Sequence, residues 1–293
     1  DDTLVQWPVG TEIIDDMPGG VPAPVMVVIP AGSFTMGTEA GQASRAAERP
    51  SRRVTLQRPI AVARTEITVE QFAQFVADAH YRIERGCWYH SKDQQWALDE
   101  NASWRAPIYG QSGSFPVTCI NWWDARMYAA WLSRQTGEHY RLPSESEFEY
   151  VNRAGVQGDL PFGLSSSSDL CAVVNGADDS TGLPYANVCR EAYEHASPVG
   201  SFQRNAFGLA DTSGNLWEFT RDCWHEDFGG HWRTLFTGPP TDGSAWIFGG
   251  CQLHVLKGGS YLSSPDNLRL TSRIPGQGSL RLNRVCFRLV REL

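Results

Sequence analysis

The sequence predicts one domain that contains both β-strands and α-helices, together with long stretches of little regular structure. Three observations support this prediction: short apolar runs broken by Gly and Pro near the N-terminus, helical spacing of apolar residues in later segments, and closely spaced turn residues in the second half. The chain has 293 residues, of which 41% are hydrophobic. A chain of this length buries about 75% of the surface of its unfolded form, so one large core is sufficient.

The first strands are predicted between residues 25 and 36. An apolar run at 25–29 is followed by Pro-Ala-Gly, and a second run at 33–36 ends at Gly37. Pro and Gly favour turns, so the pattern indicates strand, turn and strand. Residues 1–24 are predicted to form an N-terminal extension. Residues 25–293 are predicted to form a single domain, because no linker rich in Pro or Ser divides them.

Three helices are predicted in the middle of the chain. Residues 66–80 show helical spacing behind Thr68, a candidate N-cap, and residues 124–137 show the same spacing. A third helix begins near Pro143, where Ser144 followed three residues later by Glu147 matches a capping box.

Regular structure is predicted to be sparse after residue 155. Turn residues recur there every 5 to 8 residues or so, and the segment is rich in Gly, Ser, Asp, Asn and Trp. Irregular segments must still satisfy their buried backbone polar groups. Abundant Asp and Asn side chains then favour bound cations as well as disulfides.

Charge and hydropathy exclude two classes of partner. The 25 Lys and Arg against 33 Asp and Glu give a net charge of −8, opposite to the basic surface that binds nucleic acid. No run approaches the roughly 20 consecutive apolar residues of a membrane span. The chain begins at Asp1 without Met, as removal of an export signal would leave, although a shortened chain would look the same.

The cysteines indicate an oxidising compartment. Seven of them occur singly, with no C-x-x-C and no Cys/His cluster at zinc spacing, so disulfides are favoured over structural zinc. Disulfides form in the bacterial periplasm or outside the cell, and we expect a periplasmic protein. The odd number leaves one thiol unpaired.

Eight motifs then follow one another in a fixed order over nearly the whole chain. They are IPAGSFTMG at 29–37, EIT at 66–68 leading to Phe72 and Phe75, Pro116-Val117 leading to NWWDA at 121–125, RLPSE at 141–145 leading to Glu149, NAFGL at 205–209, GNLWE at 214–218, KGGSY at 257–261, and Phe287-Arg288. In this set the chain resembles the formylglycine-generating enzyme, or sulfatase-modifying factor, family. The resemblance implies an α+β domain with the formylglycine-generating-enzyme fold. This fold is an elaborated relative of the C-type lectin fold, has low regular secondary structure, and is stabilised by calcium and disulfides.

The resemblance also implies two structural calcium sites, made of the hard oxygen ligands that calcium requires. The family's positions fall on Asn175, the Gly176 carbonyl, Glu191 and the Tyr193 carbonyl for one site, and on Asp211, the Gly214 carbonyl, the Leu216 carbonyl and Glu218 for the other. Glu191 stands where the family usually has Asp. The alternative for Asp211 and Glu218 is a pair of loop-capping carboxylates without metal.

Three disulfides are predicted. Cys171 with Cys189 and Cys223 with Cys251 resemble bridges of bacterial relatives, and Cys87 with Cys119 is the third predicted pair. Cys286 then remains as the free thiol, which we interpret as a small buried hydrophobe rather than a reactive nucleophile.

The decisive departure from the family lies in its active site. Family oxidases carry two cysteines, three and eight residues after the Ser of Gly-Gly-Ser, and these bind copper(I) as thiolates. Here the two positions are Ser263 and Leu268. A serine hydroxyl is a poor donor and leucine has none, so we expect no copper and no sulfatase activation by the family mechanism. Any other redox cofactor stays unidentified.

A polar, arginine-bearing cleft with aromatic walls is expected in place of the copper site. Its candidate residues are Trp217, Ser260, Tyr261, Ser263, Asn267, Arg269 and Arg273. Trp and Tyr offer stacking faces to a planar ligand, and Arg pairs with carboxylate or phenolate oxygens. The alternative for Trp217 is core packing, and for Arg273 an ion pair with an acidic loop.

Three functions follow as hypotheses. In its length, its cysteines and the missing copper pair, the chain resembles one group of exported relatives. That group acts in the last steps of pyoverdine maturation, in which a dihydro chromophore is oxidised to the fluorescent quinoline. We therefore favour an oxidoreductase-like factor that acts on a small aromatic or peptide substrate as a monomer. A lectin-like binding module that holds a protein partner on residues 267–284 is the alternative. Ser263 and Leu268 argue against the third, a conventional formylglycine-generating oxidase.

Overall fold

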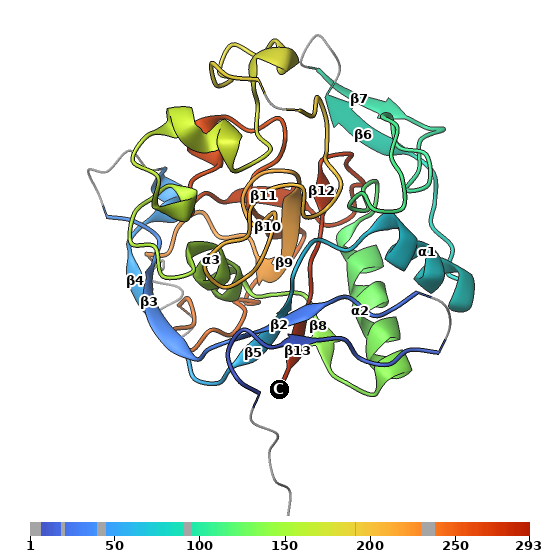
Figure 1. The fold of residues 1–293 in the computed structure, drawn as a ribbon, viewed down its shortest axis with the longest axis horizontal. Coiled ribbons are helices and arrows are strands. Elements are labelled where there is room, and N and C mark those ends of the chain that lie inside the picture. The colour runs from blue at the N-terminus through green and yellow to red at the C-terminus, as the bar shows by residue number, and fades with distance from the viewer. Residues whose placement is uncertain (1–6, 19–20, 40–44, 91–94, 191, 230–237) are drawn as a thin grey trace, which may run out of the picture.

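The computed structural model describes residues 7–18, 21–39, 45–90, 95–190, 192–229 and 238–293. Within these ranges the regular structure consists of a five-stranded sheet, a four-stranded sheet, two hairpins and three α-helices (Figure 1). This is the α+β architecture that the sequence predicts.

The five-stranded sheet joins the two ends of the chain. Its order is β1 (Glu12–Ile13), β2 (Met26–Ile29), β5 (Ile60–Ala63), β13 (Val290–Glu292) and β8 (Tyr140–Arg141), and neighbouring strands are antiparallel. Strand β1 comes from the segment predicted as an N-terminal extension, and Ile13 is buried in the main core.

The four-stranded sheet occupies the middle of the molecule (Figure 1). Its order is β11 (Ile274–Gln277), β10 (Leu253–Lys257), β9 (Trp217–Cys223) and β12 (Val285–Cys286). Strand β12 runs parallel to β9, with Val285 opposite Trp217. This pairing places the C-terminal segment beside the first residue of β9.

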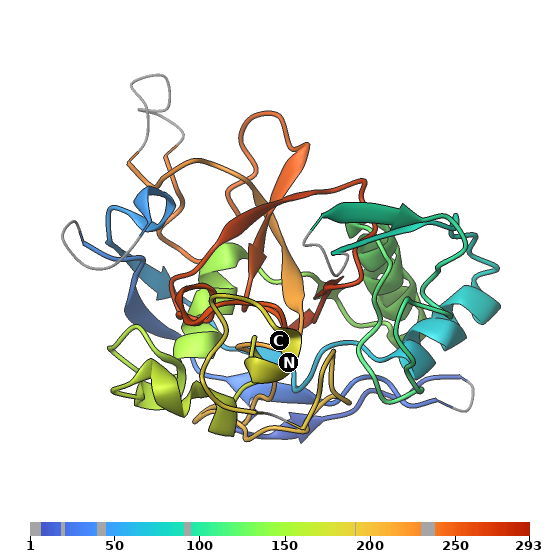
Figure 2. The same ribbon diagram turned by 90° about the horizontal axis from the view of Figure 1, so that it is seen from above.

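Two hairpins complete the strands. Strand β3 (Gly32–Met36) pairs with β4 (Arg52–Leu56), and β6 (Cys87–His90) pairs with β7 (Trp96–Asp99). The predicted strands at 25–29 and 33–36 correspond to β2 and β3, which lie in different sheets. In both views the β6–β7 hairpin lies against the C-terminal segment (Figures 1 and 2), where Trp88 forms a parallel bridge with Leu282.

All three predicted helices are present, each with a reciprocal capping box. They are α1 (Val69–Asp78), α2 (Trp122–Thr136) and α3 (Glu145–Arg153), with Thr68, Asn121 and Ser144 as N-caps. Helix α2 begins two residues before the predicted start at Asp124, because Asn121 accepts from the Asp124 backbone while the Asp124 side chain accepts from Asn121. Between α3 and β9 the described residues form only three short 3-10 helices, as predicted.

The main core lies between α1, α2 and the two large sheets. Phe72, Phe75, Tyr128 and Phe287 pack there as an aromatic cluster, and Trp217 is part of the same core. Burial of such rings is the largest favourable term in the stability of the domain.

The three predicted disulfides are all present: Cys87–Cys119, Cys171–Cys189 and Cys223–Cys251. Cys286 is a free thiol and is buried, also as predicted. Within the described ranges no helix is both long enough and apolar enough to cross a membrane.

Candidate functional site

The structure does not gather the predicted cleft residues into one cleft. Arg269 donates to both carboxylate oxygens of Glu48 at 2.6 and 2.7 Å. Arg273 donates to Glu145 at 2.6 and 3.0 Å, and its guanidinium lies over the Trp224 ring. Neither arginine lines a cavity with Trp217. The expectation of an open cleft bearing these two arginines is therefore corrected: both are buried in ion pairs that connect separate segments.

The turn after Gly-Gly-Ser is closed. Ser263 Oγ accepts from the Ser260 backbone N–H at 2.9 Å, and both residues are buried. Leu268 is fully buried and packs with Leu170 and Val174. Asn267, also predicted in the cleft, ends the 3-10 helix Pro265–Asn267. The two positions where the family holds copper(I) are thus a hydrogen-bonded hydroxyl and a core side chain, and this donor set does not fit a soft metal.

An aromatic pocket lies instead between the β6–β7 hairpin and the four-stranded sheet. Its volume is about 290 Å³. Three tryptophans and one arginine line it, namely Trp88, Trp96, Trp217 and Arg284. Apolar residues complete the wall, among them Leu256, Ile274, Pro275, Leu280, Leu282 and Val285. Trp217 is the predicted candidate that the structure places here. Sequence reasoning missed the other three, although a tryptophan next to the disulfide cysteine Cys87 was a usable signal.

Among the described residues that line this pocket, Arg284 is the only basic one, and its charge is poorly compensated. Its guanidinium lies over the Trp96 ring, with 4.5 Å from Cζ to the ring centroid. Burial lowers the pKa of Arg284 below its ordinary value, while the phenols of Tyr261 and Tyr185 favour the charged form. Among the residues described, no carboxylate forms an ion pair with it.

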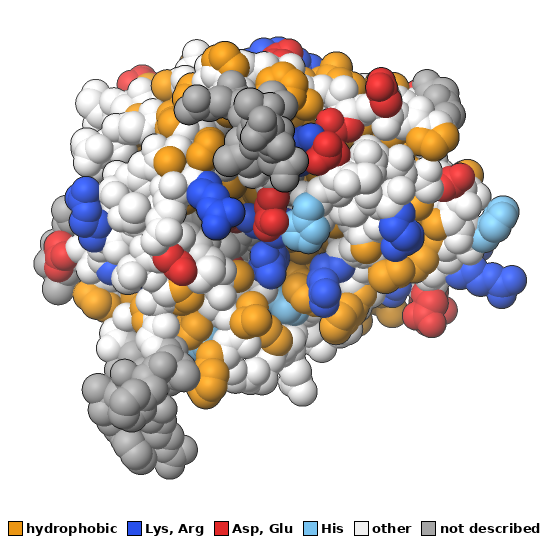
Figure 3. Space-filling view, turned by 90° about the horizontal axis from the view of Figure 1, so that it is seen from below, with side chains coloured by type: hydrophobic (Ala, Val, Ile, Leu, Met, Phe, Trp, Pro, Cys, Tyr) orange, Lys and Arg blue, Asp and Glu red, His pale blue; other side chains and the backbone are white. Residues whose placement is uncertain are grey.

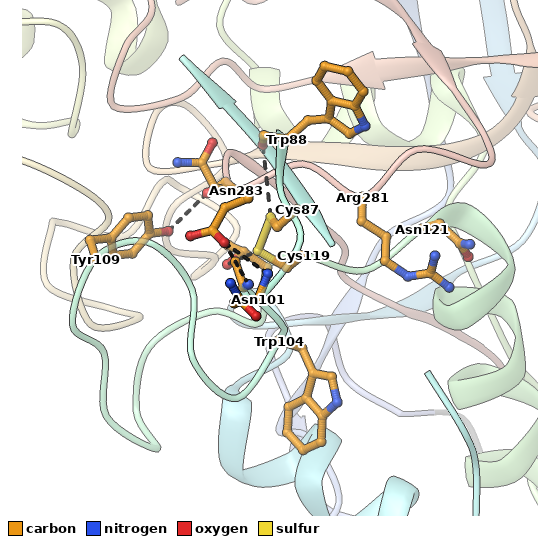
Figure 4. Close-up of a disulfide and its surroundings, with 12 residues drawn as sticks. Cys87, Trp88, Asn101, Trp104, Tyr109, Cys119, Asn121, Arg281 and Asn283 are labelled. Atoms are coloured by element: carbon orange, nitrogen blue, oxygen red, sulfur yellow. Dashed lines mark hydrogen bonds between the residues drawn. A yellow bond between two sulfur atoms is a disulfide. The ribbon is translucent and has the colours of Figure 1, made fainter. Parts of the chain in front are cut away.

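A second pocket, of about 430 Å³, is lined in part by Asn283, the residue before Arg284. Tyr109, Tyr261 and His195 line it, with ring centroids 5.0 to 5.9 Å apart. Tyr109 donates to the Asn283 carbonyl at 3.0 Å, and the Asn283 amide donates to the Tyr261 oxygen at 3.2 Å. Figure 4 shows Tyr109 and Trp88 on opposite sides of the Cys87–Cys119 disulfide. Burial raises the pKa of both phenols, so they stay protonated at neutral pH.

A third concavity is polar and lined by side chains of both charges. They include Arg58, Arg141, Arg221, Glu147 and Glu292, and Arg141 pairs with both glutamates at 2.7 Å. Seen from below, basic and acidic side chains also alternate near the centre of the surface (Figure 3). Mixed charge of this kind offers no single-sign surface to a charged ligand.

The predicted calcium ligands lie in two loops that touch, since the Asn215 backbone N–H donates to the Asn175 carbonyl at 2.7 Å. In the first set, Asn175 Oδ1 is buried without a hydrogen-bond partner. Gly176 and Tyr193 lie in the same loop region, and Glu191 lies outside the described residues. An unpartnered buried oxygen is costly, and a hard cation would satisfy it.

The second set is only partly available for a cation. Asp211 Oδ1 is buried without a partner, and its Oδ2 accepts from the Gly200 N–H at 2.6 Å. Both oxygens of Glu218 accept from Arg288, at 2.7 to 3.0 Å. Gly214 and Leu216 lie between these two carboxylates in the chain. In the described ranges no group of three His, Cys, Asp or Glu side chains is close enough to hold a metal.

The free thiol has no reactive surroundings. Cys286 Sγ donates to Glu66 Oε1 at 3.5 Å, and both residues are fully buried. Burial and the neighbouring carboxylates Glu66 and Glu218 raise the pKa of Cys286 well above its ordinary value. The thiol is therefore protonated at neutral pH and unreactive, because the thiolate is the nucleophilic form.

The segment 267–284, suggested above as a protein-binding face, is mostly interior. Residues 268–273 are all buried, and only Pro275, Gln277 and Ser279 are exposed in the stretch. A protein-binding surface along this segment would need most of its side chains to be exposed to solvent.

Comparison with known proteins agrees with the motifs. Residues 15–293 match the sulfatase-modifying factor enzyme 1-like domain. The chain is 30% identical to the formylglycine-generating enzyme of Bos taurus over 276 residues, which is 84% of this chain and 68% of that protein. It is 31% identical to the inactive C-alpha-formylglycine-generating enzyme 2 of Bos taurus over 222 residues, 67% of this chain and 69% of that one.

Among solved structures, PvdO from Pseudomonas aeruginosa superposes with a TM-score of 0.80 and 32% identity, covering 98% of this chain and all of PvdO. Treponema denticola variable protein 1 shares the fold, with a TM-score of 0.70 and 17% identity over 96% of this chain and 99% of that protein. The chain therefore belongs to the formylglycine-generating enzyme, or sulfatase-modifying factor, family.

Proposed function

We propose that this protein is exported to the periplasm and acts in the maturation of an aromatic siderophore, at the step that oxidises dihydropyoverdine to pyoverdine. The observation that carries the proposal is the likeness to PvdO along the whole length of both chains. The three disulfides support export, because such bonds persist in an oxidising compartment. Ser263 and Leu268 remove the thiolates that sulfatase activation would need.

The aromatic pocket supports an aromatic substrate. Trp88 and Trp96 offer stacking faces for a planar ring system, the buried Trp217 closes the inner wall, and Arg284 offers a bidentate donor for the oxygens of the ring. The oxidation removes two hydrogens from the chromophore, so two protons and two electrons must pass to an oxidant, such as dioxygen, that comes from outside the described residues. The part that these residues supply is to hold the ring and keep water from it.

The experiment is mass spectrometry of the secreted and periplasmic metabolites of a strain deleted for this gene, compared with its parent. We expect an aromatic species two hydrogens heavier than the normal product to accumulate. Re-expression of the wild-type gene should restore the normal product. An unchanged metabolite profile would overturn the proposal.

We also propose structural calcium at two neighbouring sites, one in the loop of Asn175 and one in the loop of Asp211. The support is the pair of buried oxygens without partners, one in each loop. Bound calcium would fix two irregular segments against each other and would take no part in the chemistry.

A further inference from the structure

We propose that the aromatic pocket binds a planar aromatic ring that carries an oxyanion, with Arg284 as its counter-charge and the tryptophans as its walls. This inference deepens the proposed function and rests on it for the natural substrate. It names the chemistry that the pocket selects, a ring bearing a carboxylate or phenolate. It also assigns to Arg284 a role in specificity.

The charge of Arg284 is the first argument. The buried arginines Arg269, Arg273 and Arg288 are each neutralised by a carboxylate, namely Glu48, Glu145 and Glu218. Arg284 is half-buried, and it differs from the half-buried Arg52 and Arg221 by lining the aromatic pocket. Arg284 has a ring below it and phenols near it, but no carboxylate partner among the described residues. A charge that is partly desolvated and unpaired is unfavourable, and a bound anion removes that penalty.

The walls are the second argument. Trp88 and Trp96 come from the two strands of one hairpin, and Trp217 comes from the start of β9. The remaining lining is almost entirely aliphatic. An apolar pocket with a cationic side chain at its edge selects a planar ligand that is hydrophobic over most of its surface and negatively charged at one end.

The size is the third argument. A volume of about 290 Å³ is at the lower end of ligand pockets, which range from roughly 300 to 1,000 Å³. It fits a system of one or two fused rings and excludes a whole siderophore peptide. Trp96 is 45% exposed, so the pocket opens at the hairpin and leaves space for the rest of a larger molecule.

The test is a titration of the folded protein with 2-naphthoate and, separately, with its neutral methyl ester, followed by tryptophan fluorescence and calorimetry. The two probes have the same rings and differ in charge. We expect the anion to bind about tenfold or more tightly than the ester, because hydrogen bonds to charged groups are the stronger kind. Equal affinities, or no binding of either probe, would overturn the inference.

Variants assign the effect to Arg284. Arg284→Met should remove the preference for the anion while the ester still binds, and Arg284→Lys should keep only part of it, since an ammonium lacks the planar fork. Arg126→Met is the matched control, because Arg126 also lies over a tryptophan, 4.8 Å from the Trp122 centroid, but outside the pocket. An unchanged preference in Arg284→Met would overturn the assignment. Circular dichroism of each variant verifies its fold.

The outcomes separate this inference from the proposed function. If 2-naphthoate binding depends on Arg284 but deletion of the gene leaves the metabolites unchanged, the ligand-binding role of the pocket is supported and siderophore maturation is rejected. If the deletion strain accumulates the dihydro species but the protein binds 2-naphthoate and its methyl ester equally, siderophore maturation is supported and the selectivity for an anion is rejected.

Discussion

The interior around α3 and the pocket at the β6–β7 hairpin differ in whether a carboxylate neutralises their arginine. Arg273 is fully buried, donates to Glu145 and is stacked on aromatic rings. Arg284 is also stacked on a ring, yet no described carboxylate neutralises it. A paired arginine connects segments of the fold, whereas an unpaired one beside a cavity is available to a ligand. The comparison predicts that substitutions in the first region change stability and substitutions in the second change binding.

The largest expected effect is at the paired arginine. Arg273→Met leaves Glu145 buried without a partner and should lower the free energy of unfolding by about 3–5 kcal/mol, measured by urea denaturation. Adding Glu145→Gln should recover part of the loss, because the uncompensated charge disappears. An Arg273→Met protein that is as stable as the wild type but binds ligand more weakly would contradict the structural role assigned to Arg273.

Leu268 tests whether the former copper position is now structural. Leu268→Ala removes a fully buried side chain that packs on Leu170 and Val174, and should cost about 2–5 kcal/mol of stability. Binding of 2-naphthoate to the fraction that remains folded should be unchanged. Loss of binding at unchanged stability would show that this position contacts the ligand.

Calcium should raise the unfolding midpoint of the wild-type protein. At a calcium concentration 100 times the dissociation constant the gain is about 2.7 kcal/mol. Asn175→Ala should be less stable in chelator, because its Nδ2 no longer donates to the His195 carbonyl and to Asn215. It should also lose most of the calcium-dependent gain, because the unpartnered Oδ1 is the proposed ligand. Scanning calorimetry with and without chelator gives both numbers. A gain that survives in Asn175→Ala would place any bound calcium elsewhere.

A pH-dependent effect is expected from a histidine that is stacked and uncharged. His254 lies parallel to Trp122 with 3.8 Å between ring centroids, and burial lowers its pKa to about 4. The unfolded chain takes up this proton near pH 6.5, so stability is highest above pH 6.5 and falls as the pH decreases toward 4. His254→Phe should flatten this slope in thermal unfolding followed from pH 7 to 4. An unchanged slope would assign it to other groups.

Local signals predicted much of the fold. The capping residues Thr68 and Ser144 act over short distances, so the helices α1 and α3 were recognisable from the sequence. The disulfide pairs Cys171–Cys189 and Cys223–Cys251 were predicted from the resemblance to bacterial relatives. Ordered motifs gave the family.

The site was harder to predict because charge compensation is a tertiary property. Nothing near Arg273 or Arg269 in the chain shows that Glu145 and Glu48 neutralise them. The pocket combines residues 88, 96, 217 and 284, which only the hairpin and the parallel pairing of β12 with β9 bring together. Trp217 was predicted from its motif, and Arg284 was not.

The position of β13 has a consequence for the order of folding. This strand lies between β5 and β8, and Val290 pairs with Val62 and with Arg141. The five-stranded sheet therefore cannot close while the chain is still emerging, whether from a ribosome or through a translocation channel. Contacts so distant in sequence also slow folding. The edge of β5 stays unpaired until residues 290–292 arrive, so the complete sheet forms only after this segment has emerged.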